Sequence, residues 1–185
     1  CTAERQYRFP LEMGDQRTPT AQWTVSGSGA AVIAEGGEGL RITGGTFGTV
    51  VDMGIDDANN MGAAMAPAAA DTISTYMREH HCAPEDFDMI LTGDLGQLGK
   101  SVLADLLAKK GYDAQGKLQD CGCMIFSPEQ DTHMGGSGCG CSAVVLNSRI
   151  YHKMCAGELK KVLFVATGAL LSQTSSMQGD SIPGI

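Results

Sequence analysis

Two stretches near the start of the chain are rich in β-branched residues and punctuated by glycine, a pattern typical of β-strands. They run from residue 22 to 34 and from residue 40 to 51, and the glycine-rich segment 35–39 separates them. A short, glycine-rich connection between two such runs favours a tight turn. The pattern therefore predicts two strands joined by a turn.

An Ala- and Met-rich stretch from residue 61 to 80 shows helical periodicity. The apolar positions that fall on one side of the predicted helix are Ala70, Ile73, Tyr76 and Met77. Pro67 lacks a backbone N–H, so we expect it in the first turn of this helix. His80 and His81 close the stretch, where an imidazolium ion interacts favourably with the helix dipole.

From residue 88 onward, short apolar runs alternate with helical patterns. The predicted strands are 88–93, 118–126 and 161–167, and the predicted helices are 99–110, which Gly111 ends, and 137–157. Strands that alternate with helices form a mostly parallel sheet with helices on both faces. The predicted fold class is therefore α/β.

The loops that follow the strands are the candidate site, because ligands of open α/β sheets bind beyond the carboxyl ends of the strands. These loops span residues 92–96, 127–138 and 167–172. The middle loop is dense in glycine and leads into a helix, whose first backbone N–H groups can receive a carboxylate. The residues expected to bind a ligand are Asp94, Gly96, Asp131, His133, Gly135, Gly136, Ser137, Gly138, Cys139 and Gly168.

Asp94 and two of the cysteines each allow a second interpretation. Asp94 follows a strand, which is the usual place for a functional side chain, but it would also serve as the N-cap of the next helix. Cys139 or Cys141 could form a thiolate–imidazole pair with His133, or could pack as an inert thiol against the sheet. The residues alone leave these alternatives open.

Four cysteines occur as two closely spaced pairs, Cys121-Gly-Cys123 and Cys139-Gly-Cys141. Zinc sites usually place about two to four residues between paired ligands. Here one pair falls in a predicted strand and the other at a helix start, where alternate residues point apart. We therefore expect no metal site and no resident cofactor. The seven cysteines are expected to be reduced, because the start of the chain lacks a secretion signal.

The composition, with 43% hydrophobic and 18% charged residues, predicts a folded globular protein. A net charge of −8 without a Lys/Arg cluster argues against nonspecific nucleic-acid binding. No apolar run approaches the roughly 20 residues of a membrane-spanning helix, so any membrane association should be peripheral. Trp23 is expected in the core, and Glu4, Arg5, Arg8 and Arg17 form either an ion-pair cluster or a solvated surface.

Several strings of residues, taken together, closely resemble the stage V sporulation protein AD family over nearly the whole chain. They are Arg8-Phe-Pro-Leu-Glu12, Pro19-Thr-Ala-Gln-Trp-Thr-Val25, Gly93-Asp-Leu-Gly96, Asp120-Cys-Gly122, Gly135-Gly-Ser-Gly-Cys-Gly-Cys-Ser-Ala-Val-Val145, Ala166-Thr-Gly-Ala-Leu-Leu-Ser172 and Gln178-Gly-Asp-Ser-Ile-Pro-Gly-Ile185. That family is similar to the thiolases and ketoacyl synthases. The resemblance implies a thiolase-like, layered αβαβα fold with mixed, mostly parallel sheets, truncated at both ends.

On this resemblance, residues 1–55 would be the C-terminal part of the first thiolase-like half and residues 56–185 the second half. The nucleophilic cysteine of the enzymes would lie upstream, so Cys1 is not that residue. Segment 93–96 stands where the related enzymes have a catalytic His, and segment 135–138 stands where they have an Asn. An ionised Asp94 cannot donate a hydrogen bond to a thioester oxyanion. We therefore expect no catalytic residues and no enzymatic activity.

The resemblance also implies the ligand, the partners and the location. The expected function is the binding of dipicolinic acid, free or as its calcium chelate, for uptake into the developing spore. The implied partners are other stage V sporulation membrane proteins and a second copy in a homodimer. The implied location is intracellular, in the forespore and peripheral on the inner spore membrane. The alternatives are an acyl-CoA-dependent acyltransferase or condensing enzyme of the thiolase superfamily, and a subunit that serves only in assembly.

Overall fold

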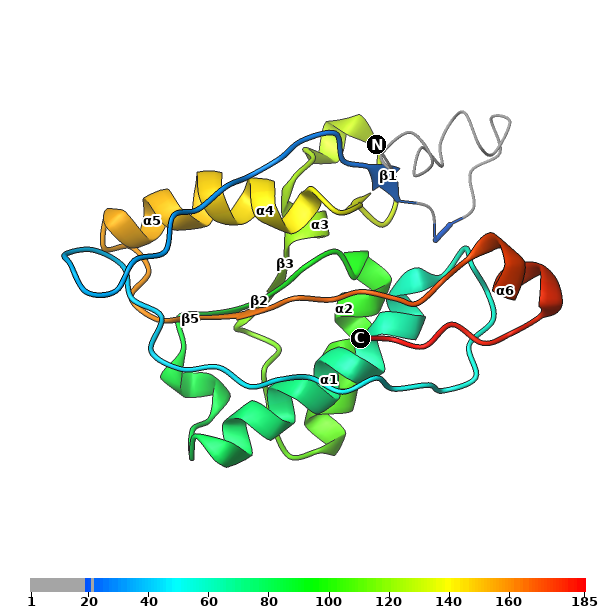
Figure 1. The fold of residues 1–185 in the computed structure, drawn as a ribbon, viewed down its shortest axis with the longest axis horizontal. Helices are drawn as coiled ribbons and strands as arrows, with labels where there is room; N and C mark the ends of the chain where they lie inside the picture. Colours follow the sequence, from blue (N-terminus) through cyan, green and yellow to red (C-terminus); the bar gives the residue numbers. More distant parts are fainter. Residues whose placement is uncertain (1–18, 21) are drawn as a thin grey trace.

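The computed structural model describes residues 19–20 and 22–185 (Figure 1). The sequence hypothesis about Glu4, Arg5, Arg8 and Arg17 lies outside these residues. The described part is a mixed α/β structure with parallel strands in open sheets, consistent with a layered, thiolase-like fold. The division of the chain at residue 55 stays a prediction.

The central sheet has three parallel strands in the order β3-β2-β5. Their bounds are Met89–Thr92 for β2, Leu118–Asp120 for β3 and Val162–Val165 for β5. Thr92, the last residue of β2, pairs with Asp120 on one side and Val165 on the other. The carboxyl ends of the three strands therefore lie level, and the prediction of a parallel sheet is confirmed.

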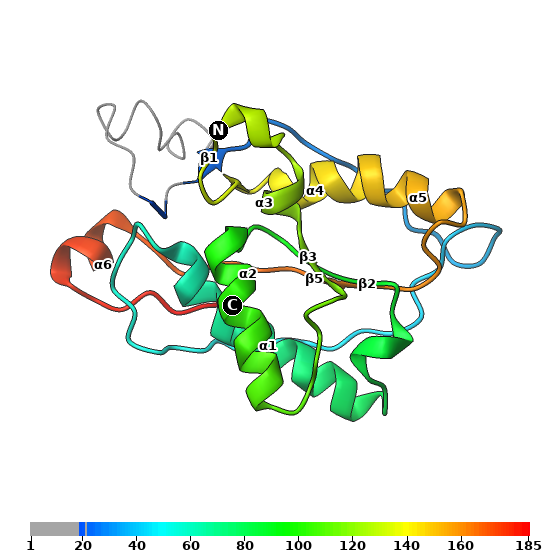
Figure 2. The ribbon, with the colours of Figure 1, turned by 180° about the vertical axis from the view of Figure 1, so that it is seen from behind.

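Helices cover both faces of this sheet (Figures 1 and 2). Helices α1 (Met61–Glu79) and α2 (Gly96–Lys109) pack on one face with Ile90 of β2. The helical segments α3 (Cys121–Met124), α4 (Cys141–Val145), η4 (Leu146–Ile150, π-helical) and α5 (Tyr151–Cys155) cover the other face, where Leu91 is buried. Ile90 and Leu91 point to opposite faces because successive side chains of a strand alternate.

Helix α1 differs from the prediction at Pro67, which lies inside the helix and not in its first turn. Asn60 caps the helix, and its side chain accepts a hydrogen bond from the N–H of Ala63. Helix α1 crosses α2 where Gly62 meets Gly99: a Cβ added to Gly62 would lie 3.0 Å from the Cα of Gly99. Proline has no backbone N–H, so the intrahelical hydrogen bond that residue 67 would donate cannot form.

The predicted strand 118–126 is shorter than expected, because the chain turns into helix α3 directly after Asp120. The Asp120 side chain accepts the N–H of Cys123 and so acts as the N-cap of α3. The first cysteine pair therefore lies in a helix and not in a strand. The prediction of a helix over 137–157 was also too long, because the helical run begins at Cys141.

The predicted strands 22–34 and 40–51 are mostly wrong. Strand β1 covers only Trp23–Thr24 and pairs in parallel with β4 (Gly136–Ser137), while Val51 makes a single antiparallel bridge to Gly184. Residues 26–50 are almost entirely exposed. The β-branched residues do favour an extended backbone, but a strand also needs a neighbouring strand to hydrogen-bond with. In the described part of the chain, residues 26–50 have no such neighbour.

Four short elements complete the described chain. They are η2 (Pro84–Asp86), η3 (Pro128–Gln130), α6 (Gln173–Gln178) and the bridge between Ala169 and Gly184. None of the helices in the described residues is both long and apolar enough to cross a membrane.

Candidate functional site

A polar cavity of about 240 Å³ lies where the loops after β2, β4 and β5 meet. Asp94 reaches it from the first loop, Ser137, Gly138 and Cys139 from the second, and Gly168 from the third. These five were predicted from the sequence, and the structure brings them together. The other residues that line the cavity are Thr24, Met61, Met65, Ser142, Thr167 and Ala169. The polar cavity thus combines hydroxyl groups with two methionine side chains.

Asp94 ties the three loops to one another. Its Oδ2 accepts hydrogen bonds from Ser137 Oγ (3.0 Å) and from the Gly138 N–H (2.9 Å). Its Oδ1 accepts a longer bond from Thr167 Oγ1 (3.4 Å), and its backbone N–H donates to the same hydroxyl (3.2 Å). Asp94 is therefore not the N-cap of α2, as one interpretation of the sequence proposed. Its carboxylate is held at the centre of the site.

Asp120, and not Asp94, accepts the backbone N–H groups at the start of α2. It is fully buried, and it accepts hydrogen bonds from the N–H groups of Leu95 (2.9 Å), Gly96 (3.0 Å) and Cys123 (3.2 Å) and from Thr92 Oγ1 (2.7 Å). These bonds fix the loop that carries Asp94. The sequence reasoning missed Asp120, although an Asp at the carboxyl end of a buried strand was a signal that could have identified it.

Gln22 is a second buried residue that the sequence reasoning missed. Its Nε2 donates to the carbonyl oxygens of Asp94 (3.1 Å) and Gly136 (3.0 Å), so one side chain joins the first loop to the second. Such a side chain holds the loop backbones at a fixed separation, because both carbonyl groups would otherwise need another donor. No pattern in the sequence distinguishes Gln22 from an ordinary strand residue.

Three predicted glycines serve packing and do not line the polar cavity. A Cβ on Gly96 would lie 2.7 Å from Gln22 Nε2, and a Cβ on Gly135 would lie 2.4 Å from the carbonyl oxygen of Gly122. A Cβ on Gly136 would lie 2.6 Å from Ile125 Cγ2. These residues are glycines because the loops behind the cavity approach one another too closely for any side chain.

Asp131 and His133 are exposed and do not line the polar cavity. Both have left-handed backbone conformations, with φ of 49° and 53°. The structure therefore does not bring these two predicted residues together with the other candidates. Their place in the loop suggested a role, but sequence distance along an irregular loop does not indicate where side chains point.

The cysteines around the site differ in their burial. Burial raises the pKa of the Cys121 and Cys123 thiols to about 12, with a further contribution from the charge of Asp120. Burial, followed by the charge of Asp94, also raises the pKa of Cys141, which favours its interpretation as an inert thiol. Cys139 is exposed and lines the polar cavity.

Among the described residues, no group of three or more His, Cys, Asp and Glu side chains could hold a metal ion.

Burial raises the pKa of Asp94 above its usual range, and the charge of Asp120 adds to this shift. The hydrogen bonds from Gly138, Ser137 and Thr167 act in the opposite direction, because they stabilise the charged form. Desolvation is the largest of these effects. The site therefore keeps a carboxyl group whose proton is lost less readily than that of an exposed aspartate.

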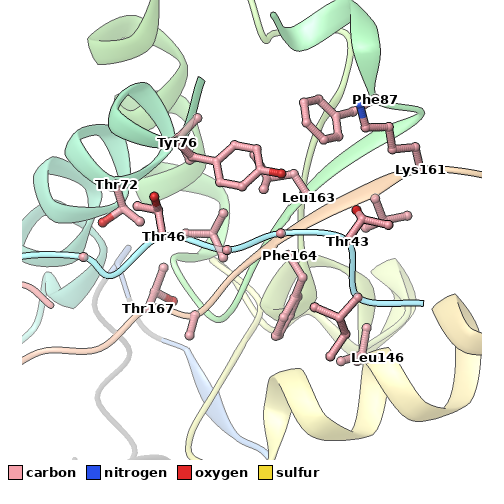
Figure 3. Close-up of a pocket in the computed structure, with 18 of the residues that line it drawn as sticks. Thr43, Thr46, Thr72, Tyr76, Phe87, Leu146, Lys161, Leu163, Phe164 and Thr167 are labelled. Carbon is pink, nitrogen blue, oxygen red and sulfur yellow. The ribbon is translucent and has the colours of Figure 1, made fainter. Parts of the chain in front are cut away.

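A larger cavity of about 810 Å³ runs along β5, between that strand, α1 and segment 40–50 (Figure 3). Apolar side chains such as Tyr76, Phe87, Leu163 and Phe164 line it. β5 pairs with β2 on one edge, and in the described chain no strand pairs with its other edge, which faces this apolar cavity. The two cavities meet at Thr167 and Gly168, which line both.

Comparison with known proteins identifies the family. Residues 1–185 match the family model for Stage V sporulation protein AD (SpoVAD). Stage V sporulation protein AD from Bacillus subtilis (strain 168) is 48% identical to this chain over 185 residues, which cover 100% of the chain and 55% of that relative. The chain thus spans about half the length of the curated relative that it matches. With its match over every residue, the chain belongs to the stage V sporulation protein AD family.

Proposed function

We propose that this protein binds dipicolinic acid, free or as its calcium chelate, in the polar cavity, and that this binding serves uptake into the developing spore. One observation carries the proposal. Three loops at the carboxyl ends of the strands converge on a small cavity that offers hydroxyl groups on one wall and methionine side chains on another. Family membership supplies the link to sporulation.

Dipicolinic acid is a flat aromatic ring with two carboxylates, so it needs both hydrogen-bond donors and an apolar surface. Ser142 and Thr167 provide hydroxyl groups at the cavity wall, and a hydrogen bond to a charged group contributes about 1.5–3 kcal/mol. Met61 and Met65 provide flexible thioether side chains, which make favourable contacts with aromatic rings. The volume of about 240 Å³ suits a small ligand of this kind.

The charge of the site favours a ligand that brings its own cation. In the part of the chain that the structure describes, no Lys, Arg or His lines the polar cavity, and the net charge of the chain is −8. A free dianion would therefore be bound without a positive side chain beside it, whereas the calcium chelate carries no net charge. In this proposal calcium arrives as part of the ligand and not as a resident cofactor.

The proposed role is binding and not catalysis. A nucleophilic cysteine needs an accessible thiolate, and burial keeps Cys121, Cys123 and Cys141 protonated. Asp94 accepts hydrogen bonds at the site and, when ionised, cannot stabilise an oxyanion by donating one. One observation supports the alternative of an acyl-CoA-dependent acyltransferase: Cys139 places an exposed thiol in the cavity.

The proposal extends to partners and location. Uptake of dipicolinic acid into the spore requires a path across a membrane, which integral membrane proteins would provide. We therefore propose that it works in the forespore, peripherally on the inner spore membrane, as a homodimer bound to other stage V sporulation membrane proteins. The family description names a stage V sporulation protein, which links the proposal to the developing spore.

Calorimetric titration of the full-length protein with dipicolinate, with and without calcium, tests the proposed function. Ser142→Ala should weaken binding by about ten-fold or more, because it removes one hydrogen bond to a charged carboxylate, worth about 1.5–3 kcal/mol. Ser148→Ala is the matched control, because Ser148 lies further along the same helical run, is exposed and does not line the cavity. Folded protein that releases no heat with either ligand would contradict the proposal.

Labelling with iodoacetamide separates binding from catalysis. If the cavity only binds dipicolinate, Cys139 should react at the rate of an ordinary exposed thiol, and saturating dipicolinate should slow the reaction. Cys155, which is also exposed but does not line the polar cavity, is the internal control and should be unaffected by the ligand. A Cys139 that reacts far faster than Cys155 at neutral pH would favour the acyltransferase.

A further inference from the structure

The donors best placed to bind a carboxylate in the polar cavity are already used by the protein itself. The N–H of Gly138 and the hydroxyl of Ser137 both point at Asp94 Oδ2, at 2.9 and 3.0 Å. The Thr167 hydroxyl makes its longer bond to Oδ1 of the same side chain. All four residues line the cavity. The Asp94 carboxylate therefore sits where the carboxylate of a ligand would find its donors.

We infer that Asp94 is a specificity-determining residue that competes with the ligand: a free carboxylate enters the polar cavity only when the Asp94 side chain is neutral or gives up its donors. This inference rests on the proposed function. An ionised Asp94 opposes a dianion in two ways, because it occupies the donors and because like charges repel. A protonated Asp94 no longer repels the ligand and holds these donors less strongly, because hydrogen bonds to a neutral acceptor are weaker than those to a charged one. It can also donate a hydrogen bond to the ligand itself.

Among the described residues, a carboxylate and thiols face Asp94, while three hydrogen bonds stabilise its charged form. Asp120 faces it from the end of β3, and the thiols of Cys121 and Cys141 face it from α3 and α4. Helix α1 contributes Met61 and Met65, and the loop after β5 contributes the Thr167 hydroxyl. Within residues 19–20 and 22–185, none of the residues that line the cavity is basic. Burial and the charge of Asp120 both raise the pKa of Asp94, which makes proton uptake on ligand binding easier.

Three consequences follow for binding. Affinity for free dipicolinate should fall as the pH rises through the pKa of Asp94 in the ligand-free protein, because the favoured, protonated state is then lost. The complex should form with uptake of up to one proton, which goes to the Asp94 carboxylate. The calcium chelate should show a weaker pH dependence, because its lack of net charge removes the repulsion.

The decisive variant is Asp94→Asn in the full-length protein, titrated with free dipicolinate between about pH 5.5 and pH 8. Asn keeps an acceptor oxygen for Gly138 and Ser137 but removes the charge. At neutral pH we expect about ten-fold tighter binding than in the wild type, and a pH profile that reflects only the titration of dipicolinate itself. Asp105→Asn is the matched control, because Asp105 is exposed on α2, and it should bind like the wild type.

Proton uptake in the wild-type protein gives a second test that needs no variant. Calorimetry in buffers of different ionisation enthalpy should detect protons taken up with free dipicolinate, and fewer with the calcium chelate. Binding without proton uptake, together with an Asp94→Asn variant that binds no tighter, would overturn this inference and leave dipicolinate binding intact. If no protein binds either ligand at any pH, the proposed function fails and this inference fails with it. If Asp94→Asn does not fold, the proton count in the wild type decides.

Discussion

The polar cavity and the apolar cavity differ in size, in lining and in how firmly their walls are held. The polar cavity has about 240 Å³, and the buried side chains of Gln22 and Asp120 hydrogen-bond the loops that form it. The apolar cavity has about 810 Å³ and separates β5 from the exposed segment 40–50. Volume alone would favour the apolar cavity as the ligand-binding site, whereas the placement of hydrogen-bonding groups favours the polar cavity.

The difference has a physical cause. Polar groups that are buried must find partners, so the loops around Asp94 are fixed by a network in which nearly every donor has an acceptor. Segment 40–50, across the apolar cavity from β5, is held to α1 by two exposed hydrogen bonds, from Thr46 to Glu79 and from Thr49 to Asp71. A site whose groups are positioned in advance binds a small ligand better than a larger space with loosely held walls.

Of the substitutions around the polar cavity, Asp120→Ala should lower the free energy of unfolding the most. It removes the acceptor for three backbone N–H groups and one hydroxyl in the interior, so we expect a loss of about 3–5 kcal/mol in the free energy of unfolding. Urea denaturation measures it. Asp105→Ala, on the exposed side of α2, should change stability by less than about 0.5 kcal/mol. A loss below about 1 kcal/mol for Asp120→Ala would mean that the network does not hold the loops.

Two glycine substitutions test how tightly the walls of the polar cavity and of the apolar cavity are packed. Gly136→Ala, behind the polar cavity, would place a Cβ 2.6 Å from Ile125 Cγ2 and 2.8 Å from Val25 Cγ2, so we expect a loss of about 1–3 kcal/mol. Gly45→Ala, in the wall of the apolar cavity, meets nothing within 4 Å and should be neutral or slightly stabilising. Thermal unfolding compares the two variants. Equal losses would show that both walls are packed alike.

Phe164→Ala measures how open the apolar cavity is. Phe164 lies on β5, and 37% of it is exposed, so truncation should cost only about 1 kcal/mol. A fully buried Phe typically costs about 3–5 kcal/mol on the same change. Urea denaturation of the full-length protein should therefore show a small loss. A loss in the range of a buried Phe would reveal that segments beyond the described residues fill this cavity.

The pH dependence of stability should give the smallest effect and should report on Asp94 alone. The pKa of Asp94 is raised in the folded protein, so its ionised form costs stability at neutral pH, and this cost disappears as the pH falls through the folded-state pKa. As the pH falls from about 7 to about 4, the wild type should therefore gain stability relative to Asp94→Asn.

Urea titrations of both proteins across this range measure that difference. Asp52 and Asp88, whose pKa values are lowered by hydrogen bonds, titrate in both proteins and cancel in the comparison. A difference that does not change with pH would mean that Asp94 titrates in the folded protein as it does in the unfolded chain.

The sequence predicted the β5 side of the fold well and the N-terminal side badly, for different reasons. Strand β5, strand β2 and helix α2 lie within a few residues of their predicted bounds, because their periodic patterns reflect burial on a sheet face. The stretches 22–34 and 40–51 have equal strand propensity but only brief pairing, at Trp23–Thr24 and at Val51. Strand formation depends on a partner, and no local pattern specifies one.

Hydrophobic periodicity was enough to predict the α/β alternation and the three loops at the carboxyl ends of the strands, because it depends on local order. Motifs in the sequence also identified the family. The packing of the loops was needed to show that Asp94 takes up the donors of Ser137 and Gly138, that Asp120 is the cap, and that His133 lies outside the cavity. These contacts join residues 24 to 44 positions apart, and such pairings depend on how the loops pack.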